Sequence, residues 1–92
     1  MGTKSKDNQL ERELKALANK RRLAIIRFLR QKKEAMVGDI AEAIKLSFKS
    51  TSKHLAVLKG ADLVEYEQRG LSYYYRLTLP LPKISQTIFS LI

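Results

Sequence analysis

The apolar residues of this chain change their spacing about two thirds of the way along the sequence, and this change constrains the fold more than any other feature. Before that point they recur at helical intervals, as Leu10, Leu14 and Leu17 do at i, i+4 and i+7. After it, Val64–Gln68 and Ser72–Leu77 are short runs rich in β-branched and aromatic residues, separated by a turn that contains a glycine. Such a pair of runs predicts a β-hairpin, so we expect a group of helices followed by one hairpin.

Local signals divide the chain before the hairpin into helices and one short strand. Asn19 and Ser47 are suited to begin helices, because their side-chain oxygens accept a hydrogen bond from a free backbone N–H. The expected elements are a helix from Leu10 to Leu17, a helix over about residues 20–32, a very short strand at Ala35–Val37, a helix that opens at Asp39, and a helix from Ser47 that ends near Gly60. Pro80 and Pro82 then stop the second strand, and Pro82 suits the first turn of a last helix.

Two helices joined by a tight turn and followed by a hairpin form the winged helix-turn-helix. The expected fold class is therefore mainly α with a small β-hairpin, in the order helix, helix, short strand, helix, helix, hairpin, helix. Residues 1–9 are polar, and we expect them to form a flexible, basic N-terminal tail. Residues 10–92 are expected to form one winged helix domain with terminal helices that serve dimerisation.

The charge of the chain is strongly unbalanced, with 18 Lys and Arg against nine Asp and Glu and a formal net charge of +9. Such an excess favours a polyanionic partner, either nucleic acid or an acidic membrane surface. The alternative interpretation is a lysine-rich surface that only keeps the protein in solution. No run of about 18 apolar residues is present, so nothing in the sequence is suited to span a membrane. We expect a cytoplasmic, nucleoid-associated protein without a membrane partner.

Residues that carry out catalysis or bind metals are scarce in this sequence. There is no cysteine, and His54 is the single histidine, so disulfides, thiolate metal sites and thiol catalysis are excluded. One histidine cannot build a metal site alone, and no carboxylate pair or glycine-rich phosphate loop stands out. We therefore expect a protein that is not an enzyme and has no catalytic residues, no metal site and no cofactor.

Three segments of the chain resemble the ArsR family of bacterial and archaeal repressors. Leu14–Leu29, LKALANKRRLAIIRFL, is similar to the opening segment of the family, and Tyr73–Leu77, YYYRL, is similar to the end of its hairpin. The most specific segment is Gly38–Gly70, which contains the pattern S…S(K/R)HL…L…LV. The resemblance covers residues 14–77. It implies a winged helix-turn-helix protein that binds DNA and forms a dimer through its terminal helices.

The sequence departs from that family at the positions where many members bind metals. Met36 and Gly38 stand where metal-sensing members have two cysteines. The last helix, expected within Lys83–Ile92, has neither the His nor the Asp of a second group of metal sensors. The resemblance therefore does not imply a metal-responsive protein here. Lys45 replaces the usual turn glycine, and a positive φ at this position would make the lysine cost about 1 kcal/mol.

The segment between Lys45 and Gly60 holds four lysines, the histidine and no acidic residue. Lys49 and Lys53 are four residues apart, so they share a helix face that lies opposite the apolar stripe. The resemblance implies that this is the recognition helix and that the hairpin tip lies against the minor groove or its phosphates. The residues expected to contact DNA are Ser47, Lys49, Ser50, Ser52, Lys53, His54 and Arg69.

Phe48 stands in the first turn of this helix, where the family often has glutamine. We favour a packing role, in which the ring holds the turn against the body of the protein. The alternative is an apolar contact with a thymine methyl group. For Tyr73–Tyr75 we favour packing of the hairpin over stacking on bases.

Aliphatic residues are concentrated in the first and last helices, where one small domain cannot cover them all. The residues expected at a dimer interface are Leu10, Leu14, Leu17, Ile84, Ile88 and Phe89. In such a dimer, two recognition helices would lie about 34 Å apart, the length of one DNA turn, on a palindromic site.

The predicted function is sequence-specific binding of double-stranded DNA by a transcription regulator, acting as a repressor, through the helix at residues 47–59 and the wing at residues 64–77. Two alternatives stay open: a non-specific architectural DNA-binding protein, and a winged helix that binds only other proteins. The sequence identifies neither an effector ligand nor an operator.

Overall fold

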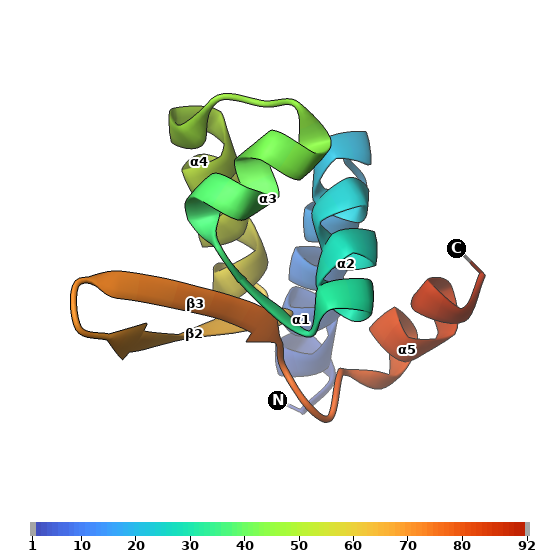
Figure 1. The fold of residues 1–92 in the computed structure, drawn as a ribbon. Coiled ribbons are helices and arrows are strands. Elements are labelled where there is room, and N and C mark those ends of the chain that lie inside the picture. The colour runs from blue at the N-terminus through green and yellow to red at the C-terminus, as the bar shows by residue number, and fades with distance from the viewer. Residues whose placement is uncertain (1, 92) are drawn as a thin grey trace.

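Residues 2–91 are described in the computed structural model, with side chains from residue 6 onward. They form helices and strands in the order expected for a winged helix-turn-helix (Figure 1). The elements are α1 (Gly2–Leu17), α2 (Lys20–Lys32), β1 (Glu34–Met36), α3 (Val37–Ile44), α4 (Phe48–Gly60), β2 (Val64–Arg69), β3 (Ser72–Leu77) and α5 (Lys83–Ser90). The predicted fold class is confirmed.

The three strands form one antiparallel sheet in the order β1-β3-β2. β2 and β3 are the predicted hairpin, and its turn begins at Gly70, because Arg69 pairs with Ser72. Gly70 has a φ of 64°, the left-handed conformation that glycine adopts at the lowest cost. β1 lies along the other side of β3, with Ala35 opposite Tyr75. This pairing ties the hairpin to the helices.

The core lies between the helices and the inner face of the sheet. α2 provides its centre, because Ile25, Ile26 and Leu29 are almost completely buried. Leu55 and Leu58 of α4 pack into the same cluster. In Figure 1 the hairpin and α5 project on opposite sides of the helical body. α4 is therefore held by the core, whereas the tip of the hairpin projects away from it.

The predicted helix caps are present. Asn19 Oδ1 accepts hydrogen bonds from the backbone N–H groups of Arg21 and Arg22, at 2.9 and 3.1 Å. Ser47 Oγ accepts one from the backbone N–H of Ser50, at 3.1 Å. These side chains satisfy donors that have no partner within their own helix, so both predicted helix starts are confirmed.

The turn between α3 and α4 places Lys45 in the left-handed conformation, with a φ of 57°. The backbone N–H of Lys45 donates to the Glu42 carbonyl at 3.3 Å, and that of Leu46 donates to the Ala41 carbonyl at 3.0 Å. These bonds end α3 in the manner of helices that stop at a left-handed residue. Because lysine carries a Cβ atom, it is strained here by about 1 kcal/mol relative to glycine.

Two helix starts differ from the prediction. Residues 2–9, expected as a flexible tail, belong to α1, so the expected boundary at residue 10 is wrong; residue 1 lies outside the described residues. This segment contains no proline, and its two lysines and one glutamine favour helices. α3 begins at Val37 rather than Asp39, because the extended backbone of Met36 (φ −78°, ψ 158°) ends β1 and precedes the helix directly.

The ends of two other elements differ by one or two residues. Gly60 is the last residue of α4, and the left-handed residue that follows is Asp62, with a φ of 61°. Pro82 is the N-cap residue of α5, one position before the predicted first turn. Neither difference changes the order of the elements.

Candidate nucleic-acid interface

α4 has one face in the core and the opposite face in solvent, as predicted. Thr51, Leu55 and Leu58 are completely buried. Lys49 and Lys53 are exposed on the opposite side, because each helical residue turns the chain by about 100°. Within residues 6–91, neither of these two lysines forms an ion pair. α4 thus presents two ammonium groups that are free to meet an anion.

The other predicted polar residues of α4 reach solvent to different degrees. Ser47 is exposed, but its hydroxyl oxygen already accepts the Ser50 N–H. Ser50, Ser52 and His54 are half-buried. Ser47, Lys49 and Lys53 are thus the exposed members of the predicted set in this part of the chain.

A hydrogen bond connects α2 to the middle of α4. Arg22 Nη1 lies 3.2 Å from His54 Nδ1. Because a guanidinium only donates, His54 accepts at Nδ1 and carries its proton at Nε2. Burial, followed by the charges of Arg22 and Arg21, lowers the pKa of His54 below its ordinary value, so the ring is neutral near pH 7.

The same Arg22 guanidinium also holds the end of α1. Its Nε donates to the Ala16 carbonyl, and its Nη2 donates to the Lys15 carbonyl at 3.0 Å. These carbonyls belong to the last turn of α1, where helix carbonyls have no partner in their own helix. Arg22 therefore joins three helices.

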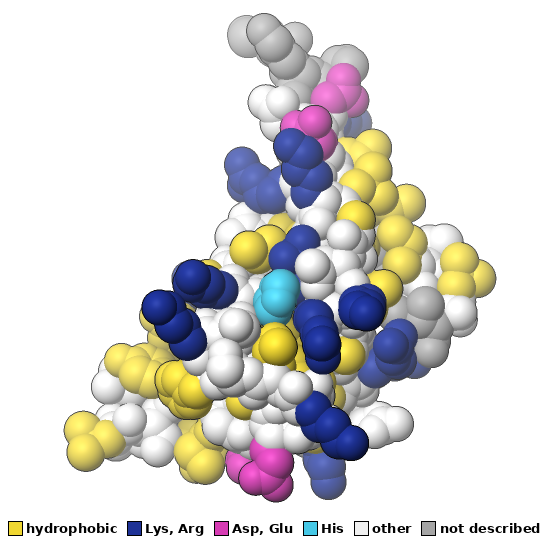
Figure 2. All heavy atoms as spheres, turned by 90° about the horizontal axis from the view of Figure 1, so that it is seen from above, with side chains coloured by type: hydrophobic (Ala, Val, Ile, Leu, Met, Phe, Trp, Pro, Cys, Tyr) yellow, Lys and Arg dark blue, Asp and Glu magenta, His cyan; other side chains and the backbone are white. Residues whose placement is uncertain are grey.

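Further cations flank α4 at the start of α2 and the end of α3. Arg21 Nη1 donates to the Ile44 carbonyl at 3.4 Å, which holds this arginine beside the turn that carries Lys45. Figure 2 shows Lys and Arg side chains around the single histidine, with acidic side chains at the edges of the view. We call the surface formed by the following residues the basic face: Arg21, Lys45, Lys49, Lys53 and His54.

Arg21 and Arg22 are absent from the predicted set of contacts. The run Lys20–Arg22 is visible in the sequence, but a run of charges does not show which element it will lie against. Its place beside α4 follows only from the packing of α2 on α4.

The predicted wing contact, Arg69, is held in ion pairs. Its guanidinium donates to both carboxylate oxygens of Glu34 on β1 and to Glu67 Oε1, the latter at 3.1 Å. The guanidinium carbon also lies 4.5 Å from the centre of the Tyr74 ring. The hydrogen bonds to Glu34 and Glu67 raise the pKa of Arg69. A contact between Arg69 and DNA would require these bonds to break.

Arg76 extends this network across the hairpin. It bonds to Glu65 at 2.8 Å and to Glu67 at 2.9 Å. The hydrogen bonds from Arg69, then from Arg76, lower the pKa of Glu67. The outer face of the sheet therefore carries arginine–glutamate ion pairs whose charges neutralise one another.

The opposite face of the hairpin carries Tyr66, Tyr73 and Tyr75, whereas Tyr74 lies on the outer face beside Arg69. The Tyr66 ring lies 5.2 Å from that of Tyr73 and 5.3 Å from that of Tyr75, measured between ring centres. Burial, then the neighbouring Tyr66 and Tyr73, raises the pKa of Tyr75. The rings of Tyr73 and Tyr75 thus pack on that of Tyr66 across the hairpin.

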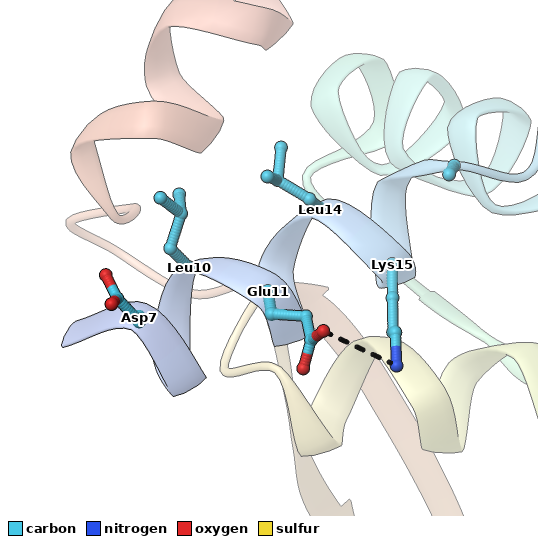
Figure 3. Close-up of a pocket in the computed structure, with 6 residues that line it drawn as sticks. Asp7, Leu10, Glu11, Leu14 and Lys15 are labelled. Carbon is cyan, nitrogen blue, oxygen red and sulfur yellow. Dashed lines mark ion pairs between the residues drawn. The ribbon is translucent and has the colours of Figure 1, made fainter. Parts of the chain in front are cut away.

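α1 is apolar on two sides. Ala16 and Leu17 lie in the core, whereas Leu10 and Leu14 are 41% and 44% exposed. In Figure 3 the side chains of Leu10 and Leu14 project to the same side of α1. They line an open recess of about 500 Å³ whose other lining residues are Asp7, Glu11, Lys15 and Ala18.

Two of the residues predicted at a dimer interface are core residues of the single chain. Leu17 and Phe89 are almost completely buried and belong to the core cluster. Ser85 Oγ donates to the buried Glu13 at 3.0 Å and so holds α5 on α1. The expectation that Leu17 and Phe89 offer exposed surface is wrong. The remaining residues of the set are the exposed Leu10 and Leu14 and the half-buried Ile84 and Ile88.

In the described part of the chain, no group of three or more His, Asp and Glu side chains is arranged to hold a metal ion. None of its helices combines the length and apolarity that a bilayer crossing requires.

Comparison with known proteins decides the family. The family described as "Bacterial regulatory protein, arsR family" matches residues 19–66, from the cap of α2 into β2. This chain belongs to the arsR family. The HTH-type transcriptional regulator Rv0324 of Mycobacterium tuberculosis is 41% identical over 70 residues, which cover 76% of this chain and 30% of that protein. The arsenical resistance operon repressor of Bacillus subtilis is 36% identical over 67 residues, covering 73% of this chain and 64% of that protein.

This arsR-family chain spans less than two thirds of the length of these two relatives. Among solved structures, it is similar to the homodimeric winged helix-turn-helix DNA-binding domain of Mb0332 from Mycobacterium bovis. The TM-score is 0.84 and the identity 35%, over 97% of this chain and 79% of that one. The chain has the winged helix-turn-helix fold of that domain, and the relatives that it matches are named as transcription regulators.

Proposed function

We propose that this arsR-family regulator is a repressor that binds a palindromic site in double-stranded DNA as a homodimer. The observation that carries the proposal is the basic face, where Lys49 and Lys53 project from α4 opposite its buried stripe. Lysine ammonium groups bind phosphates and the acceptors of guanine, and the N-terminus of a helix itself attracts phosphate. The name of the Bacillus subtilis relative, a repressor, supports the direction of control.

Pairing of two copies through α1 and α5 supplies the second basic face that a palindrome requires. Leu10 and Leu14 leave an apolar surface on α1, and the Glu13–Ser85 hydrogen bond places α5 beside it. Aliphatic side chains gathered on one surface of a small protein mark a contact with another molecule. The homodimeric state of the Mb0332 domain supports a second copy as that molecule.

Specificity is tested by selecting bound duplexes from a random pool and then measuring competition. We expect a dissociation constant of about 10 nM or tighter for the selected duplex and binding to random duplex at least about a thousandfold weaker. Binding should weaken steeply with salt, because lysine–phosphate contacts release counterions. Equal affinity for both duplexes would favour the architectural protein, and no duplex binding at any salt concentration would favour the winged helix that binds only proteins.

The basic face is tested by Lys49→Ala combined with Lys53→Ala. The affinity for the selected duplex should fall towards that for random duplex, because the outer face of α4 loses both ammonium groups. The matched control is Lys32→Ala with Lys83→Ala, which removes the same charge from two exposed lysines outside the basic face. Equal losses from the two double variants would contradict the assignment of α4.

The dimer is tested by Leu14→Asp and multi-angle light scattering. A carboxylate on the exposed side of α1 should give a folded monomer with weakened operator binding, because it cannot be buried without a partner charge. Leu79→Asp is the control, since Leu79 is 81% exposed and lies outside α1 and α5. A wild-type protein that is monomeric at micromolar concentration would contradict the dimer.

The direction of control is tested by in vitro transcription from a promoter that carries the selected site. Added protein should lower transcript yield in step with occupancy of the site. An increase would identify an activator instead.

A further inference from the structure

Phe48, the first residue of α4, is 63% exposed. The packing role favoured from the sequence is therefore wrong, because a ring that held the turn against the body would be buried. Exposing this much of an aromatic ring to water is unfavourable. The exposed ring leaves apolar area that a contact with another molecule would remove from water.

Phe48 belongs to a small group of exposed apolar residues. It lines a recess of about 270 Å³ between the start of α3, the start of α4 and the end of the hairpin. Leu71 and Tyr73 line the same recess and are 98% and 43% exposed. Figure 2 shows hydrophobic side chains beside the cations on this side of the molecule. An exposed apolar group next to a basic surface indicates a shared partner.

The position of Phe48 along α4 restricts what the ring can meet. Its neighbour Lys49 belongs to the basic face, and residues in the first turn of a recognition helix contact base edges in the major groove. The only apolar group on those edges is the C5-methyl group of thymine. A phenylalanine has no hydrogen-bonding atom with which to recognise any other base edge.

We propose that Phe48 is a specificity-determining residue, whose ring packs on the C5-methyl group of a thymine in the major groove of each half-site. The inference rests on the proposed binding of duplex DNA and adds one base to its specificity. The contact depends on the methyl group and not on the hydrogen-bonding edge of the base.

Replacement of thymine by uracil tests this contact, since it removes the methyl group and keeps every hydrogen-bonding atom. Each thymine of the selected duplex is changed to uracil in turn. For the wild type we expect about a fourfold loss of affinity for each lost methyl contact, at one position that recurs in both half-sites. Phe48→Ala should bind the thymine and uracil duplexes equally at that position.

Val57→Ala is the matched control on the same helix. Val57 is 44% exposed and lies nine residues from Phe48, about 180° around the helix axis. This variant should keep the discrimination between thymine and uracil. Because the Phe48 ring is mostly exposed, the melting temperature of Phe48→Ala should match that of the wild type, and a large fall would restore the packing role and overturn the inference.

The outcomes separate the inference from the proposed function. Specific binding without a loss at any uracil position, or a loss that persists in Phe48→Ala, overturns the role of Phe48 and leaves the proposed function intact. If the wild type binds no duplex specifically, the proposed function fails, and the inference fails with it.

Discussion

The outer face of α4 and the outer face of the hairpin carry similar cations in opposite states. Lys49 and Lys53 are exposed and form no ion pair within residues 6–91. Arg69 and Arg76 each bond to two carboxylates. A basic residue at a suitable position is thus available to bind an anion only when no neighbouring carboxylate pairs with it.

Local sequence accounts for both states. Between Lys45 and Gly60 there is no acidic residue, so α4 has no internal partner for its lysines. Alternate residues of β2 face the same side of the sheet, which places Glu65, Glu67 and Arg69 together, with Arg76 opposite Glu65 on β3. The hairpin therefore pairs both arginines with its own glutamates, and Glu34 of β1 adds a second partner for Arg69.

The largest expected effect comes from removing the cations of each region in parallel. Lys49→Ala with Lys53→Ala should weaken operator binding about a hundredfold at 0.15 M salt. The slope of log affinity against log salt concentration should become shallower by about four, because the dimer loses about four lysine–phosphate contacts. Arg69→Ala with Arg76→Ala removes the same charge but should cost less than about fivefold, because those guanidinium groups are already paired. Titration of labelled duplex at several salt concentrations measures both, and similar losses would remove the distinction between helix and hairpin.

Freeing the hairpin cations should have the next largest effect. Glu34→Gln with Glu67→Gln removes both carboxylates from Arg69, so its guanidinium can reach phosphate, and we expect operator affinity to rise about five- to tenfold. Glu11→Gln with Asp62→Asn changes the net charge equally without touching the hairpin network. If this control raised the affinity as much, net charge rather than release of Arg69 would be the cause.

The turns of the two regions also differ, in the residue that adopts the left-handed conformation. The turn before α4 holds Lys45 in the left-handed conformation, whereas the hairpin turn uses Gly70. Lys45→Gly should stabilise the fold by about 1 kcal/mol and raise the melting temperature by about 4–8 °C. Gly70→Ala should destabilise it by about the same amount through backbone strain alone, because no heavy atom lies within 4 Å of an added Cβ. Thermal melting checks both, and changes of equal sign would contradict the strain argument.

The smallest expected effect concerns pH. His54 has a lowered pKa in the folded protein, so the unfolded chain binds a proton at this histidine more readily. Folding therefore becomes less favourable as the pH falls from about 6.5 towards the folded pKa. The hairpin carries no histidine. The drop in melting temperature between pH 7 and pH 5 should be smaller in His54→Gln than in the wild type. Identical drops in the two proteins would show that protonation of His54 does not oppose folding.

The parts of the fold that the sequence predicts are those determined by neighbouring residues. Asn19 and Ser47 cap the helices that follow them, and the glycine turn makes the hairpin, because each signal acts within a few residues. The stripe of α4 also predicts which side of that helix is outward. Residues 2–9 show the limit, since polar composition alone does not exclude a helix.

Contacts between distant segments account for the differences. Arg69 lies beside the predicted turn, but its partner Glu34 is 35 residues away and reaches it only because β1 pairs with β3. Leu17 and Phe89 are expected from the sequence at a dimer interface, yet both lie in the core cluster of the single chain. Helical spacing identifies a face and does not identify what covers it.

The three-way contact of Arg22 has a mechanical consequence. One guanidinium bonds to the last carbonyls of α1 and to the imidazole in the middle of α4. A rotation of either helix against the other must break these bonds. Arg22 therefore couples the orientation of α1, which carries the exposed Leu10 and Leu14, to that of α4.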